Sequence, residues 1–168
     1  MLLVMTVILI PSGCKKEESN SAPMSKSDML QGKWQIVSYT VGEIDQLNSE
    51  ENGTFQCDNG EIISYTNISS IEPYYWNFTT GQNWDSQYHF TSHSFDMNAS
   101  NTNCTATYVD YENDGGATGT WAFNDNESQI KLMVNGIQDK WNIVSLSNTK
   151  MHLTLDGGTS HQMHLEKR

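Results

Sequence analysis

The chain has few basic residues, few prolines and no long apolar segment in its body. Among its 168 residues, nine Lys and Arg stand against 20 Asp and Glu, giving a formal net charge of −11. A field of this sign repels phosphate backbones and anionic lipid headgroups, so we expect no nucleic acid as a partner. With 36% hydrophobic and 10% aromatic residues, the chain is too apolar to be disordered, and its length suits one folded domain.

Motifs that carry catalysis are also missing. The chain has no Gly-x-Ser-x-Gly elbow, no His-Glu-x-x-His and no phosphate-binding glycine loop. We therefore predict a non-enzymatic protein with no cofactor.

Two sequence patterns resemble parts of metal-binding motifs but lack the ligands or the spacing that a metal site needs. Asp110–Gly115 resembles the first half of a calcium-binding EF-hand loop, but Trp121 stands where the bidentate glutamate belongs. We interpret the segment as a hairpin turn, and a weak cation site of Asp110, Glu112 and Asp114 is the alternative. His89 and His93 are four residues apart, a spacing that on a strand separates them by about 13 Å. We predict no metal site.

Residues 1–13 form an uncharged apolar run that ends in small residues before Cys14. The run is shorter than the roughly 20 apolar residues of a membrane-spanning helix, so it predicts a cleaved signal peptide. Residues 14–27 carry lysine, acidic residues, serine and proline without apolar periodicity, and are expected to form a flexible tether. The folded domain is expected to cover residues 28–168, as a monomer.

Ser12-Gly13-Cys14 resembles the processing site of a bacterial lipoprotein, in which Cys14 carries the lipid. Pro11 and the lack of a basic n-region depart from that pattern, and an ordinary signal peptide with an unmodified cysteine is the alternative. Lys15–Glu18 is similar to the signal that sends lipoproteins of Bacteroidetes-type bacteria to the outer leaflet, a generic spacer being the other interpretation. The resemblance implies a protein lipid-anchored at the outer membrane, on its periplasmic face or the cell surface, that contacts the membrane through the anchor only.

The chain contains three cysteines, at positions 14, 57 and 104. If Cys14 carries a lipid, an even pair remains in an oxidising compartment, which predicts a disulfide between Cys57 and Cys104. Neither belongs to a Cys-x-x-Cys pair, and no second pair exists to complete a zinc tetrad. Two free buried thiols are the alternative.

Beyond residue 32, short segments rich in Thr, Val, Ile and aromatics alternate with Asn, Asp and Gly, and no helical period is sustained. The pattern predicts an all-β domain with a loop or irregular helix within residues 43–51. The predicted strands are 32–41, 61–68, 74–80, 87–97, 104–112, 117–124, 129–135, 138–147, 150–155 and 160–166. Explicit turns join the last five, so we expect an antiparallel up-and-down meander that closes into a β-barrel, because closure removes exposed edges.

Gly32-Lys33-Trp34 resembles the Gly-x-Trp signature of lipocalins, and Gly119–Phe123 resembles a later strand of lipocalin-like lipoproteins from Bacteroidetes-type bacteria. The resemblance implies a lipocalin-like β-barrel whose closed end is plugged by Trp34, next to Gly32. Lipocalins usually stack a basic side chain on this tryptophan. Near its C-terminus this chain offers only Lys167 and Arg168 for that role.

The densest aromatic cluster falls on two predicted strands and supplies the candidate ligand-pocket residues. These are Trp76, Phe78, Tyr88 and Phe90. If they line a cavity, the barrel binds a small apolar or amphipathic molecule. If they fill a solid core, the protein is instead an interaction module whose loops, such as Gly42–Gly60, bind an envelope protein or a glycan, a use that an exposed Trp84 would suit.

Overall fold

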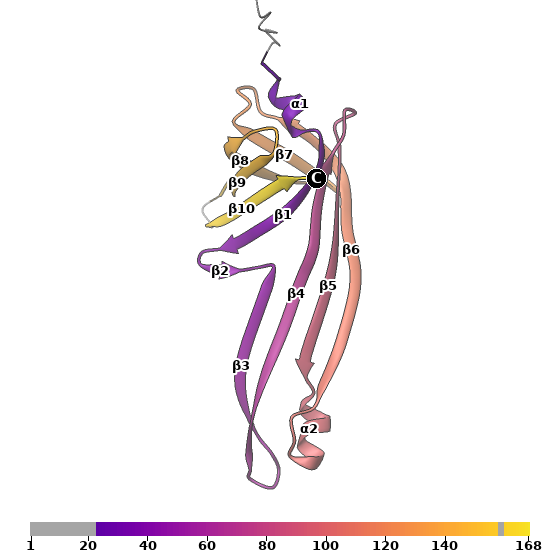
Figure 1. Cartoon of the computed structure of the whole chain (residues 1–168), viewed down its shortest axis with the longest axis vertical. Coiled ribbons are helices and arrows are strands. Elements are labelled where there is room, and N and C mark those ends of the chain that lie inside the picture. Colours follow the sequence, from indigo (N-terminus) through magenta and orange to yellow (C-terminus); the bar gives the residue numbers. More distant parts are fainter. Residues whose placement is uncertain (1–22, 158–159) are drawn as a thin grey trace, which may run out of the picture.

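The computed structural model describes residues 23–157 and 160–168, in which ten antiparallel strands and two short helices occur (Figure 1). The strands are β1 (Gly32–Val41), β2 (Ile44–Asp45), β3 (Asn48–Gln56), β4 (Ile62–Phe78), β5 (Asn83–Phe95), β6 (Tyr108–Phe123), β7 (Gln129–Val134), β8 (Ile137–Leu146), β9 (Lys150–Leu155) and β10 (His161–Lys167). The helices are α1 (Lys26–Leu30) and α2 (Met97–Asn103). The predicted all-β fold class is confirmed. The predicted signal peptide, Cys14 and most of the tether lie outside the described residues.

A closed barrel of eight strands forms one half of the described chain. In the order β1-β10-β9-β8-β7-β6-β5-β4, each strand pairs with its neighbours, and β1 returns to pair with β4. The closing ladder is short and joins Gly32–Gln35 to Tyr75–Phe78. Closure satisfies edge groups that an open sheet would expose. The predicted antiparallel up-and-down meander β-barrel is confirmed.

The end of the barrel beside α1 is closed over Trp34. This side chain is fully buried and donates its indole N–H to the Leu30 carbonyl oxygen at 2.6 Å. Lys167 Nζ lies 5.2 Å from the Trp34 ring centre and donates to the Met29 carbonyl oxygen at 2.8 Å, and burial lowers the pKa of this lysine. Gly32 has a φ of +115°, and a Cβ there would lie 3.0 Å from Lys167 Cε. Glycine is therefore required beside the tryptophan and the lysine.

Strands β4, β5 and β6 are longer than the barrel and continue beyond it, where β3 joins them (Figure 1). We call residues 48–71 and 90–113 the extension. At its far end, the Cys57–Cys104 disulfide joins the β3–β4 connection to the residue that ends α2, with the two Cα atoms 5.7 Å apart. The predicted disulfide is confirmed.

Two predicted strand breaks are wrong. The Asp114-Gly115-Gly116 turn was expected to separate two strands, but β6 runs through it, so the EF-hand-like segment lies in a strand and not in a hairpin turn. Gly115 pairs with Tyr88, and a Cβ on Gly115 would lie 2.3 Å from Tyr88 Cζ, so the glycine serves ring packing. The second break, before Tyr74, is a bulge within β4 that accommodates Pro73, because a bulge requires no ladder hydrogen bond from proline.

Two further differences concern residues 43–51 and helix α2. Residues 43–51, expected as a loop or irregular helix, form β2 and the start of β3. Helix α2 was not predicted, since its sequence lacks an apolar stripe. It begins where the Asp96 carboxylate accepts a hydrogen bond from Ala99 N and ends at Cys104 in the left-handed region.

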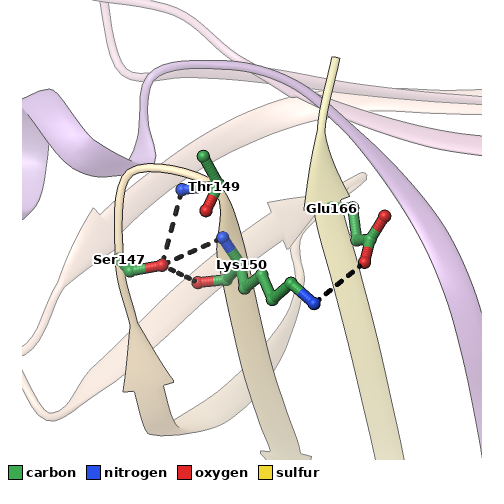
Figure 2. Close-up of polar contacts among 4 residues, drawn as sticks. All are labelled: Ser147, Thr149, Lys150 and Glu166. Atoms are coloured by element: carbon green, nitrogen blue, oxygen red, sulfur yellow. Dashed lines mark hydrogen bonds and ion pairs between the residues drawn. The ribbon is translucent and has the colours of Figure 1, made fainter.

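The predicted turn at Ser147 joins β8 to β9 as expected (Figure 2). The Ser147 hydroxyl accepts hydrogen bonds from Thr149 N at 3.4 Å and Lys150 N at 3.0 Å, and donates to the Lys150 carbonyl oxygen at 3.1 Å. Lys150 Nζ then lies 3.3 Å from Glu166 Oε1 on β10 (Figure 2). This exposed ion pair contributes at most about 1 kcal/mol. The turn itself is closed by the serine contacts and by a backbone hydrogen bond from Ser147 N to the Lys150 carbonyl oxygen at 2.9 Å.

Replacing Cys57 and Cys104 together by serine should lower the free energy of unfolding by about 2–4 kcal/mol, because the disulfide closes a long loop and restricts the unfolded chain. Urea unfolding of the wild type and the double variant measures the difference. The variant Cys14→Ser is the matched control, since it removes a cysteine outside this bond. An unchanged unfolding midpoint in the double variant would show that the bond does not stabilise the extension.

Candidate functional site

A pocket of about 450 Å³ opens at the barrel mouth, the end from which the extension leaves. Its volume falls in the range of about 300–1,000 Å³ that is usual for small-molecule sites. Strands β4 to β8 all contribute to its walls. The aromatic, hydroxyl and aliphatic side chains around the pocket are those of Tyr74, Trp84, Ser86, Tyr88, Val134 and Ile137.

Beneath the pocket, aromatic side chains fill the barrel. The Trp76 ring makes edge-to-face contacts with Trp84 at 5.6 Å, Trp141 at 5.5 Å and Phe78 at 6.1 Å, measured between ring centres. Trp76 is 3% and Phe78 1% exposed. Such contacts each stabilise by about 0.5–1.5 kcal/mol beyond area burial. The barrel around Trp76 is therefore filled by side chains, and the mouth pocket lies above this filled part.

The four candidate ligand-pocket residues are not all brought together. Tyr88 lines the mouth pocket, whereas Trp76 and Phe78 lie in the packed core beneath it. Phe90 is half-buried in the extension, with its ring centre 6.1 Å from that of Tyr111.

An exposed Trp84 would have suited the alternative of an interaction module, but this side chain is only 6% exposed and forms part of the pocket wall. Sequence reasoning missed Trp84 and Ser86 as pocket residues. The signal was present, since positions 84, 86 and 88 share one face of β5 at a period of two.

Two tyrosines, Tyr74 and Tyr88, line the mouth pocket. Tyr74 and Tyr88 are paired across β4 and β5, with their rings edge to face at 5.7 Å. Tyr39 on β1 packs against Trp141, and its hydroxyl lies 2.8 Å from His161 Nδ1. Burial raises the pKa of both the Tyr39 and the Tyr74 phenol. A phenol is protonated at neutral pH already, and the raised pKa keeps both hydroxyls protonated to higher pH than usual.

Trp84 contributes a donor that the described residues leave unsatisfied. Its Nε1 is buried and has no hydrogen-bond partner among them. A buried N–H without a partner costs about 1–3 kcal/mol, and native proteins keep few of them. Trp76 Nε1, in the core beneath the pocket, is also buried and without a partner among the described residues.

The described residues contain no group of three or more His, Cys, Asp or Glu side chains placed to hold one metal ion. His89 and His93 instead contact Asp114 at 2.8 Å and Asp110 at 2.6 Å across β5 and β6. Within the same ranges, no helix is both long and apolar enough to cross a membrane.

Comparison with known proteins adds one likeness. No family model matches the chain, and no curated protein matches its sequence. Among solved structures, the chain is similar to a lipocalin-like protein from Bacteroides uniformis, with a TM-score of 0.39 and 12% identity over 83% of this chain and 99% of that chain. The closed barrel follows from the strand pairing of the chain itself, and this likeness assigns no ligand to it.

Replacing Gly115 by alanine should displace the Tyr88 ring at the pocket wall and lower the free energy of unfolding by about 1–2 kcal/mol, because the new Cβ overlaps that ring. Urea unfolding measures the loss, with Thr118→Ala as the control on an exposed position of the same strand. In a Tyr88→Ala background, the glycine substitution should cost nothing further. An equal loss in both backgrounds would contradict the packing argument.

Proposed function

We propose that this protein is a lipid-anchored envelope lipoprotein whose lipocalin-like barrel binds a small amphipathic molecule at its mouth, without a covalent step. The observation that carries the proposal is the mouth pocket, which combines apolar walls with the polar side chains of Tyr74, Ser86 and Tyr88. Burial of apolar ligand surface against Trp84, Val134 and Ile137 would supply about 25 cal/mol per Å². Hydrogen bonds from the hydroxyls of Tyr74 and Tyr88 would orient the polar group.

The negative charge of the pocket and of the whole chain limits which ligands can bind. Asp139 is among the residues around the pocket and none of them is basic. The whole chain also carries a net charge of −11. An anionic headgroup would be repelled by this field, whereas a neutral or cationic one would not. The preferred ligand is therefore an apolar body with a neutral or cationic polar end that includes an acceptor atom.

The position of α1 supports an anchored orientation. The helix lies at the end of the barrel opposite the extension (Figure 1). The described chain enters α1 from Pro23, nine residues after Cys14, a length that spans at most about 32 Å. A lipid on Cys14 would hold the closed end toward the membrane, and the mouth and the extension would face away from it.

The filled aromatic core favours a second candidate function, in which the barrel is a solid scaffold and the surface binds an envelope protein or a glycan. The two candidates make different predictions for small apolar probes, because only the first requires the mouth to accept one.

N-Phenyl-1-naphthylamine, a neutral fluorescent probe, should bind saturably to the wild type, and Ile137→Glu should weaken this binding more than tenfold by placing a charge at the apolar rim. Ile137 is 70% exposed, so the substitution spares the core. Ile62→Glu is the matched control, because Ile62 is 67% exposed but lies in the extension. Fluorescence titration measures each affinity, and urea unfolding confirms that both variants are folded.

The related sulfonate, 1-anilinonaphthalene-8-sulfonate, should bind more weakly than the neutral probe, because it adds a negative charge to a similar ring system. Absence of saturable binding by the neutral probe, or equal weakening by Ile137→Glu and Ile62→Glu, would overturn the proposed function.

A further inference from the structure

We propose that the protein has a second binding site, for a neutral oligosaccharide, in a groove on the extension. The groove has a volume of about 630 Å³ and lies on the β3–β4 hairpin beside β6. Its polar lining comes from Asn52 and Thr54 on β3, Ser64 and Thr66 on β4, and Tyr108 on β6. It shares no residue with the barrel-mouth pocket, so the two proposals stand independently.

Strand register assembles the polar side chains of the groove. Asn52 pairs with Thr66 and Thr54 pairs with Ser64 across β3 and β4. Cross-strand partners lie on the same face, and so do residues two apart on one strand, so the four side chains form a compact array. The Thr66 hydroxyl donates to Asn52 Oδ1 at 2.6 Å, which orients the Asn52 amide.

Tyr108 forms one wall of the groove and is held from two sides. Its ring stacks on that of His93, with the ring centres 4.3 Å apart and the planes 16° from parallel. Its hydroxyl accepts a hydrogen bond from the Thr66 backbone N–H at 3.3 Å. Because the oxygen acts as the acceptor in this contact, the hydroxyl proton remains available for a ligand.

The chemistry of the lining selects a neutral polyol. The residues around the groove carry no formal charge, although the chain as a whole has a net charge of −11. Hydroxyl, amide and phenol groups both donate and accept, and so match sugar hydroxyls, while an aromatic ring packs against the apolar C–H face of a sugar. Two carboxylates lie close to the groove residues. Glu50 accepts a hydrogen bond from Asn52, and Asp110 contacts His93, whose ring stacks on Tyr108. These carboxylates would repel acidic sugars.

The test is a titration of the full chain, followed by NMR, with maltotetraose, cellotetraose and the acidic tetragalacturonate. We expect at least one neutral sugar to shift the backbone amides of residues 52–54 and 64–66 saturably, and tetragalacturonate to leave them unmoved. The sugars should not displace N-phenyl-1-naphthylamine, which separates this site from the barrel mouth. No saturable shift with either neutral sugar, or a preference for the acidic one, would overturn the proposal.

Variants then test the residues. Tyr108→Phe should weaken sugar binding about fivefold, the equivalent of one hydrogen bond, and Thr54→Val with Ser64→Ala, which removes two hydroxyls, should weaken it about 25-fold. Tyr111→Phe is the matched control, because Tyr111 lies on the same strand, is 54% exposed and is outside the groove. Equal effects of Tyr108→Phe and Tyr111→Phe would contradict the assignment. The assignment would also be contradicted if a lysine-rich peptide shifted the groove amides while the neutral sugars did not.

Discussion

The four-residue ladder between β1 and β4 is the constraint on which the rest of the structure depends. Gly32–Gln35 pairs with Tyr75–Phe78 and closes the sheet, whereas the preceding part of β4 pairs with β3. The bulge around Pro73 marks the change of partner. Where β4 leaves β1, the barrel can no longer be closed, so the mouth opens at this fork and the extension begins there. One change of pairing partner thus positions both candidate sites.

Closure also determines what the barrel can hold. All five tryptophans of the chain are buried, between 0% and 6% exposed, and they belong to the same core. An eight-stranded barrel has room either for side chains or for one small ligand. Here the side chains occupy the closed half, anchored by the Trp34 contacts with Leu30 and Lys167, and the remaining space is the mouth. The aromatic core and the pocket are therefore complementary features.

The sequence predicts the barrel well where short strands are bounded by explicit turns. The strands from Gln129 onward alternate with a period of two and are joined by Asn, Asp and Gly, and the structure matches them closely. The disulfide could also be predicted from the sequence, because only one pair of cysteines remains once Cys14 is set aside. Local patterns suffice when each element ends for a local reason.

Several features of the barrel mouth and the extension could not be predicted, because they depend on distant partners. The segment Asp114-Gly115-Gly116 has the composition of a turn. It nevertheless lies in β6, because the Tyr88 ring occupies the place that a side chain at position 115 would take. The period of two groups Trp84 with Ser86 and Tyr88, but it does not show that this face of β5 points into the barrel. The groove depends on Tyr108 reaching Thr66 from 42 residues away, a contact that no sequence period reveals.

Native mass spectrometry of the protein, purified gently from its own host, tests the central claim most directly. The account predicts a population that carries a non-covalent small molecule, which collisional activation releases, together with a covalent lipid mass on Cys14. A protein whose mass shows no releasable small molecule in any gentle preparation, while its barrel remains folded, would contradict the claim that the mouth is a binding site.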